Sequence, residues 1–203
     1  MLRYLLLILP ILLLSGCQKK NFLRLSSNEA TKGYLPSYTA PKSFRSNEGD
    51  TIFIRKVASS NYFEKANATG SNYGNLGDLD YIEVERSALI LGSDTPYFRI
   101  NIDLVTLYNA AQITNSEDRL TFTFDEENNP ASQKLEFTYT DTINCISAEC
   151  MYQDTLKLQQ QTFYKVYFNP RSSASAPSLY INKARGLVGF KTSDNKIYEL
   201  ISN

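Results

Sequence analysis

Short alternations of hydrophobic and polar residues dominate the chain from residue 51 onward. In the clearest case, four apolar and three polar side chains alternate between Phe98 and Leu104, which is the pattern of a strand with one buried face. Similar β-favouring stretches, bounded by turn residues, are 52–57, 81–91, 120–124, 135–139, 162–168, 179–182, 187–191 and 196–201. The pattern predicts a chain built mainly of strands.

The connections between these stretches predict how the strands pair. Residues 120–124 and 135–139 flank a polar turn at 125–132 and are expected to form a hairpin. Such short connections leave no room for repeated helical crossovers, so we expect an antiparallel sheet domain, a sandwich or a partial barrel, with at most one or two short helices. The helical candidates are a pair resembling a capping box, Asn61 with Glu64, and an apolar face of Leu104, Leu107, Tyr108 and Ala111.

The beginning of the chain has a different pattern. Arg3 precedes an unbroken apolar run over residues 5–14, and small residues then lead to Cys17. A charged start, an apolar stretch of about 7–15 residues and a small-residue cleavage site are typical of a secretory signal, whereas a membrane-spanning helix needs about 20 apolar residues. We therefore expect residues 1–16 to be a signal peptide that is removed.

Residues Leu14-Ser15-Gly16-Cys17 resemble the lipobox of bacterial lipoproteins, which ends in an invariant cysteine. The resemblance implies that diacylglycerol is joined to the sulfur of Cys17, that the chain is cut before Cys17, and that a fatty acid such as palmitate is added to the new amino group. Several acyl chains on one residue suffice for stable anchoring. In this family an aspartate after the cysteine commonly marks inner-membrane retention, so Gln18 implies the outer membrane of a bacterial cell envelope.

The expected organisation is a lipidated N-terminus with a polar tether over residues 17–50, followed by a single β-rich domain over 51–203. Pro36, Pro41 and scattered serines support the tether. A flexible stretch of about 30 residues would reach roughly 30 Å. Apolar residues within it could instead dock part of it on the domain; these are Phe22, Leu23, Leu25, Tyr34 and Leu35.

Two cysteines, Cys145 and Cys150, remain once Cys17 carries lipid. An exported compartment is oxidising, so we expect them to form a disulfide. A loop this small would contribute roughly 2 kcal/mol in the chain-entropy model. The alternative is a redox pair, although redox motifs have two residues between the cysteines and this chain has four.

Composition excludes several functions. Lys plus Arg and Asp plus Glu both number 21, and this balance argues against a nucleic-acid partner and gives no sign of electrostatic recruitment to anionic lipid. The chain contains no histidine, which excludes Ser-His-Asp triads, Cys-His pairs and His-ligated zinc. No cofactor is expected.

The densest acidic group with neighbouring glycines consists of Asp78, Asp80, Glu83 and Glu85. It is a weak candidate for a calcium site, because Ca²⁺ takes carboxylate and carbonyl oxygens from flexible loops, but its spacing matches no EF-hand. Glu83 and Glu85 are two apart on an expected strand and should share one face. The alternative is a solvated loop and strand face.

The main functional hypothesis is a non-catalytic, lipid-anchored domain that binds a protein or glycan of the envelope or has a structural role. One alternative is a glycan hydrolase using carboxylates such as Glu83, Glu85 and Glu136, and another is a carrier of an apolar ligand. Tyrosines near predicted loops and strand ends could form a recognition surface or instead cover the core. These are Tyr62, Tyr73, Tyr97, Tyr108 and Tyr152.

Overall fold

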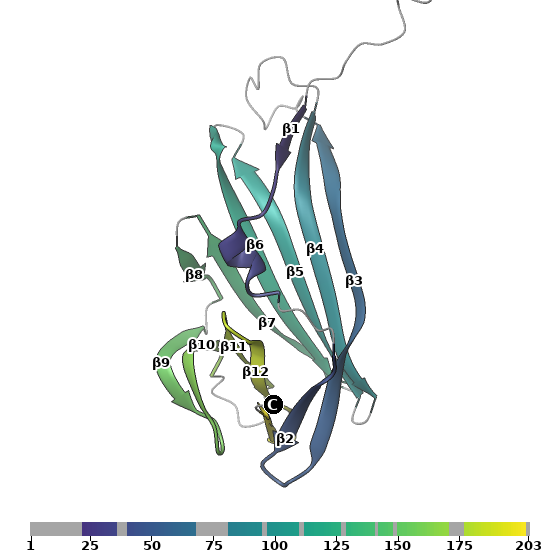
Figure 1. The fold of residues 1–203 in the computed structure, drawn as a ribbon, viewed down its shortest axis with the longest axis vertical. Coiled ribbons are helices and arrows are strands. Elements are labelled where there is room, and N and C mark those ends of the chain that lie inside the picture. The colour runs from purple at the N-terminus through teal and green to yellow at the C-terminus, as the bar shows by residue number, and fades with distance from the viewer. Residues whose placement is uncertain are drawn as a thin grey trace, which may run out of the picture.

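The computed structural model describes residues 22–35, 40–67, 81–94, 97–109, 112–126, 129–140, 142–147, 150–170 and 177–201, which form strands and one short helix (Figure 1). The elements are β1 (Phe22–Leu25), α2 (Glu29–Lys32), β2 (Lys42–Ser46), β3 (Thr51–Asn67), β4 (Tyr81–Asp94), β5 (Tyr97–Asn109), β6 (Gln112–Glu126), β7 (Asn129–Tyr139), β8 (Ile143–Cys145), β9 (Met151–Lys157), β10 (Thr162–Phe168), β11 (Ser178–Asn182), β12 (Gly186–Lys191) and β13 (Ile197–Leu200). The expected mainly β, antiparallel fold is confirmed.

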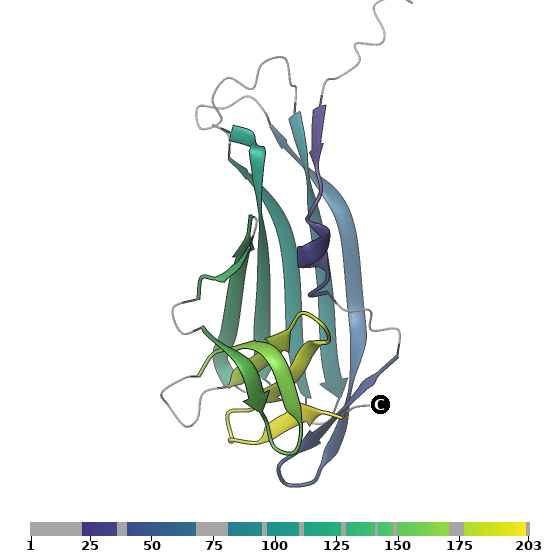
Figure 2. The same cartoon turned by 60° about the vertical axis from the view of Figure 1, so that its left-hand side comes forward.

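All strands belong to one sheet that is nearly closed into a barrel. The order is β8-β7-β6-β5-β4-β3-β2-β13-β12-β11-β10-β9, and every neighbouring pair on this path is antiparallel. The long strands β3 to β7 form a tall curved wall, and the short strands β9 to β13 fold back over its lower half (Figures 1 and 2). β1 lies off this path and pairs with β4 in parallel.

The sheet turns from one part to the other along β3. The first residues of β3 pair with β2, and from Arg55 onward the strand pairs with β4. The register shifts between Lys56 and Ala58, where β3 contains an extra residue. Such a bulge bends a strand and increases its twist, so the two parts of the sheet can face each other.

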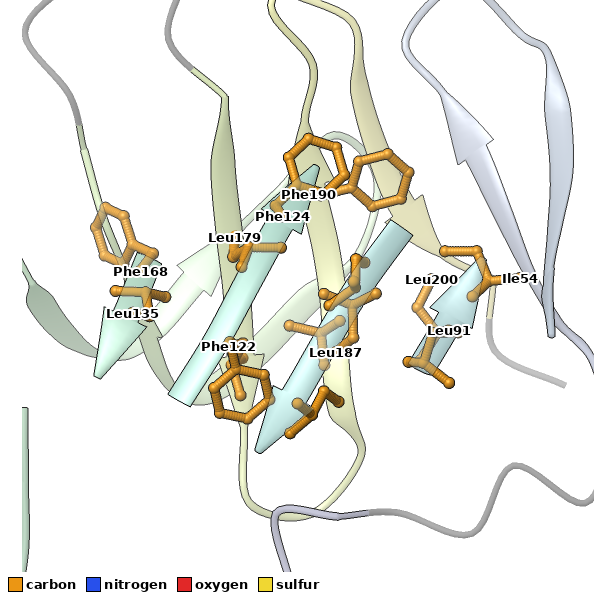
Figure 3. Close-up of a cluster of buried hydrophobic side chains, with 14 of the residues drawn as sticks. Ile54, Leu91, Phe122, Phe124, Leu135, Phe168, Leu179, Leu187, Phe190 and Leu200 are labelled. Carbon is orange, nitrogen blue, oxygen red and sulfur yellow. The ribbon is translucent and has the colours of Figure 1, made fainter. Parts of the chain in front are cut away.

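The core fills the space between the two parts. Phe190 of β12 is at its centre, with its ring centroid 4.8 Å from that of Phe98, 5.6 Å from that of Phe124 and 5.7 Å from that of Phe44. Leucine and isoleucine side chains from both parts surround these rings (Figure 3). Each aromatic pair of this kind contributes about 0.5–1.5 kcal/mol to stability beyond the burial of its apolar area. The contacts of Phe190 therefore stabilise the packing of one part of the sheet on the other.

The structure corrects several local expectations. The loop between β6 and β7 is shorter than the predicted turn at 125–132, because β6 continues to Glu126 and β7 begins at Asn129. Both helix predictions are wrong: Asn61 and Glu64 lie in β3, and Leu104, Leu107 and Tyr108 lie in β5, while Ala111 is outside the described residues. Long-range strand pairing overrides these weak local signals.

Much of the expected polar tether is folded. β1, α2 and β2 all lie within residues 17–50, and β2 is an internal strand between β3 and β13. The apolar residues of this region provide the reason, since Phe44 is fully buried and Tyr34 packs against Phe137 with ring centroids 6.4 Å apart. Within the described residues, no helix has the length and apolar character needed to cross a membrane.

Candidate functional site

The inner face of the tall wall changes from apolar to acidic between its lower and upper halves. Along β6, the apolar inward residues end at Leu120 and the next inward residue is Asp118. β4 carries Glu85 and Glu83 at the same face, and β5 carries Thr106. Glu83, Glu85 and Asp118, the acidic row, are only 7%, 4% and 3% exposed. Buried carboxylates are costly unless they are paired and hydrogen-bonded, so the row needs partners.

The partners come from residues 22–35, the N-terminal strap, which crosses this half of the wall (Figure 2). β1 pairs with β4 from Phe22 opposite Tyr81 to Leu25 opposite Val84. The pairing of β5 with β4 ends before that point, at Arg86. The strap therefore occupies the side of β4 that β5 leaves free.

Glu85 is contacted by two different residues of the strap. Its Oε2 atom accepts a hydrogen bond from the backbone N–H of Ser27 at 2.9 Å and lies 3.1 Å from Nζ of Lys32. Its Oε1 atom accepts from the side-chain amide of Asn61 on β3 at 3.1 Å. Both carboxylate oxygens thus have partners. Two strap residues bind one oxygen and one sheet residue binds the other.

Asp118 holds the start of the helix. Its Oδ2 atom accepts from the backbone N–H of Asn28 at 2.6 Å, and its Oδ1 atom accepts from Oγ1 of Thr106 at 3.1 Å. Oγ of Ser27 lies 2.8 Å from the same Thr106 oxygen. Asn28 is also the N-cap of α2, since its side chain accepts from the N–H of Ala30. The network therefore fixes the point at which the strap turns from strand to helix.

Glu83 is bound by Arg24 at the upper end of the row. The guanidinium donates to Oε2 of Glu83 from Nε at 2.8 Å and from Nη2 at 2.5 Å. It also lies over the Phe63 ring, 4.4 Å from the centroid. A planar guanidinium can form an ion pair and a stacking contact together, which lysine cannot do equally well.

The contacts of the strap shift the ionisation of this cluster. Burial alone would raise the pKa of Glu85, but the hydrogen bonds from Ser27 and Asn61 and the charge of Lys32 outweigh it and hold the pKa below its ordinary value. Burial alone would lower the pKa of Lys32, and its contacts with Glu29 and Glu85 outweigh this and raise it. The charged forms of Glu85 and Lys32 therefore stabilise each other.

The predicted calcium candidates are only partly covered by the structure. Asp78 and Asp80 lie outside the described residues. Glu83 and Glu85 share one face of β4, as their spacing predicts, and their carboxylates bind Arg24 and Lys32. Among the described residues, no group of three or more histidine, cysteine, aspartate or glutamate side chains is placed to hold a metal ion.

Cys145 and Cys150 form the predicted disulfide, with a Cα–Cα distance of 6.1 Å. Cys145 is the last residue of β8, and Cys150 directly precedes β9. These strands are the two ends of the sheet order, so the disulfide joins the two edges across the open seam of the barrel. Cys17, the predicted lipidation site, lies outside the described residues.

A surface cavity of about 290 Å³ lies where β4 and β5 separate. Its lining combines apolar and charged side chains: Glu64, Lys65, Val84, Arg86, Val105, Thr106, Leu107 and Tyr108. Its one carboxylate, on Glu64, is ion-paired with Arg86. Glycoside hydrolysis requires two carboxyl groups flanking the scissile bond, and this cavity does not supply them.

The predicted tyrosine surface is divided by the fold. Tyr62, Tyr97 and Tyr152 are exposed, on β3, β5 and β9 respectively. Tyr108 is half-buried beside the cavity, and Tyr73 lies outside the described residues. The exposed tyrosines therefore belong to separate strands and do not identify one recognition site.

The strap and its partners on the sheet were not predicted from the sequence. The sequence contains one signal for the acidic row. On β4 and on β6 the acidic residues are separated from the inward apolar residues by even numbers of positions, and such residues share one face of a strand. This spacing predicts that the carboxylates point inward. The partners of the row on the strap could not be read in this way, because Arg24 and Lys32 are 59 and 53 positions from the carboxylates they bind. Comparison with protein-family models, curated proteins and solved structures finds no match.

Proposed function

We propose that the chain is a lipid-anchored protein of the bacterial cell envelope, attached to the outer membrane through Cys17, whose β domain binds an envelope partner or has a structural role. The observation that carries the proposal is the folding of the strap immediately after the lipobox. Four residues separate Cys17 from Phe22, where β1 begins, which makes five Cα–Cα steps. Even fully extended they span at most about 18 Å. The strap thus supports close attachment of the domain to the membrane.

The chemistry of the strap supports a non-catalytic role. Of the three carboxylates expected for a hydrolase, Glu83 and Glu85 each have a cation from the strap within 3.1 Å, and Glu136 on β7 is ion-paired with Lys134, with Oε2 3.0 Å from Nζ. A general acid or a nucleophile must reach its substrate, and the strap covers Glu83 and Glu85. This arrangement favours a structural role for Glu83 and Glu85, which hold residues 22–35 against the sheet.

The disulfide across the seam and the packed interior support a rigid domain suited to binding. Aromatic rings fill the space between the two parts of the sheet, where an apolar ligand would have to lie. Exposed aromatic and apolar side chains on β9 and β10, among them Met151, Tyr152 and Tyr164, offer contact area to a protein or glycan partner. Binding is therefore preferred here over carriage of an apolar ligand.

The proposal is tested by a Cys17→Ala variant expressed in a bacterium that processes lipoproteins. Metabolic labelling with a palmitate analogue should label the wild-type chain and not the variant, and only the wild type should sediment with outer membranes. A Cys145→Ala, Cys150→Ala variant is the matched control, because it loses cysteines but keeps the lipobox. Normal labelling and membrane association of Cys17→Ala would overturn the anchor, and cleavage of a glycan by purified wild-type protein would overturn the non-catalytic role.

A further inference from the structure

We propose that the end of the sheet at which β1 begins is a membrane-contact surface, and that its partner is the headgroup layer of the membrane holding the lipid on Cys17. The inference rests on the proposed anchor and adds a second, non-covalent contact to it. The surface is an aromatic–cationic cluster of Phe22, Arg24, Phe63, Lys65 and Tyr81, contributed by β1, β3 and β4.

The register brings these side chains together on one face. Phe22 pairs with Tyr81, and their rings stack in parallel with centroids 5.2 Å apart. Two residues further along the strands, Arg24 pairs with Glu83, and Glu83 pairs with Lys65. Side chains two apart on a strand point to the same side, so the rings and the cations form a continuous surface.

The cluster combines rings with cations in direct contact. Nζ of Lys65 lies 4.7 Å from the centroid of the Tyr81 ring. The Arg24 guanidinium lies 4.4 Å from the Phe63 centroid and 5.8 Å from the Phe22 centroid. Phe22 is 45% exposed at the end of the sheet, which is a costly position for a phenylalanine facing water alone.

Charge complementarity favours lipid headgroups as the partner. The cluster contains two cations and faces one anion, Glu83, so a single positive charge remains. In the sequence segments that lead into the cluster, Lys19 and Lys20 before β1 add two positive charges and Asp78 and Asp80 before β4 add two negative ones, so the sum remains one positive charge. Phosphate groups of lipids are anionic, and basic residues near a membrane surface each contribute about 1 kcal/mol of attraction. Aromatic rings favour the interfacial layer beside them.

The short connection to Cys17 keeps the aromatic–cationic cluster close to the membrane that holds the lipid. Phe22 is at most about 18 Å of chain from Cys17, and the strap bonds to the sheet prevent residues 22–35 from lengthening this connection. Phe53 lies on the same strand as Lys65, twelve residues away toward the opposite end of the sheet. Twelve residues of extended strand measure about 40 Å. The two ends of the domain thus differ in their distance from the membrane.

The test uses the lipidated full-length protein and exploits the absence of tryptophan from the chain. Phe22→Trp and Phe53→Trp variants place a single fluorophore at each end, and both positions are exposed. Each protein is reconstituted into vesicles of phosphatidylethanolamine and phosphatidylglycerol, with and without brominated acyl chains. Trp at 22 should shift to the blue and lose about half or more of its emission to the brominated lipid, and Trp at 53 should do neither.

Flotation of the vesicles separates the two proposals. Failure of the protein to float with them contradicts the anchor, whereas a floating Phe22→Trp protein whose emission is unquenched contradicts the contact surface alone.

Wild-type protein provides a readout that needs no substitution. On vesicles, amine-reactive labelling of Lys65 should fall several-fold compared with the protein off vesicles. The control is Lys157, which is exposed on β9. It lies two residues before Gln159, which donates to backbone carbonyls of β2 and β13, and its labelling should be the same on and off vesicles. Equal labelling of Lys65 on and off vesicles would overturn the proposal.

Discussion

Nζ of Lys32 lies 3.1 Å from a carboxylate oxygen of Glu85 and 3.1 Å from one of Glu29. The same cation therefore joins a glutamate whose side chain is 5% exposed to one whose side chain is 87% exposed. Only the buried contact ties the strap to the sheet, because Glu29 belongs to the strap itself. This difference makes the two glutamates a matched pair for testing how the strap is held.

Glu85→Gln should destabilise the protein by about 1–3 kcal/mol, because it leaves Lys32 without its buried counter-charge while keeping the shape of the side chain. Glu29→Gln should change the free energy of unfolding by less than about 0.5 kcal/mol, as expected for an exposed pair. Urea titration followed by circular dichroism measures both. Equal losses in the two variants would mean that the buried contact does not hold the strap.

Acidification should release the strap before the rest of the fold. The folded-state pKa of Glu85 lies below its ordinary value of 4.5. Its contribution to stability is therefore fully present above about pH 4.5 and is lost as the pH falls through the lower folded-state pKa. The groups in contact with its carboxylate are the Ser27 backbone N–H, the Asn61 amide and the Lys32 ammonium, and Lys32 also contacts Glu29.

Hydrogen exchange, corrected for the intrinsic rate at each pH, measures this release at residues 22–35. Protection of the strap should decrease below about pH 4.5 while protection of the β5–β6 pair persists. In Glu85→Gln the strap should already be less protected at neutral pH and should change less on acidification. An unchanged pH profile in that variant would show that Glu85 does not control the release of the strap.

Phe190→Ala should cost about 3–5 kcal/mol, because it removes the ring on which both parts of the sheet pack and leaves a cavity. Phe53→Ala is the control, since that ring is 62% exposed and its loss should cost less than about 0.5 kcal/mol. The shift of the urea midpoint gives both values. A small loss in Phe190→Ala would show that the two parts of the sheet are held together elsewhere.

Removing the disulfide should open the seam locally. A Cys145→Ser, Cys150→Ser variant should lose about 2 kcal/mol, the value for a short closed loop in the chain-entropy model. The loss of amide protection should concentrate in β8 and in the residues of β7 that pair with it, since the edges of the sheet meet there. Reduction of the wild type should reproduce this change and have no effect on the variant; a uniform loss of protection along the chain would contradict the local role.

Sequence patterns were sufficient for the tall wall and the final meander, because each strand there alternates or has strong β-favouring residues. They were insufficient for β1, β2, β8 and β9, which are short and whose position depends on partners distant in sequence: Arg45 of β2, for example, pairs with Glu199. The disulfide could be predicted from the exported compartment that the first 17 residues lead one to expect. The strap could not, since its polar residues match the composition of a linker and their role becomes visible only beside the acidic row.

The central claim, lipid attachment at Cys17 directly before a folded strap, is tested most directly by mass spectrometry of the protein purified from bacterial membranes. Trypsin should release a Cys17–Lys19 peptide that carries a diacylglyceryl group on sulfur and an acyl group on its new amino terminus. Recovery of an unmodified Tyr4–Lys19 peptide as the main form from the membrane-bound protein would contradict both the cleavage and the anchor.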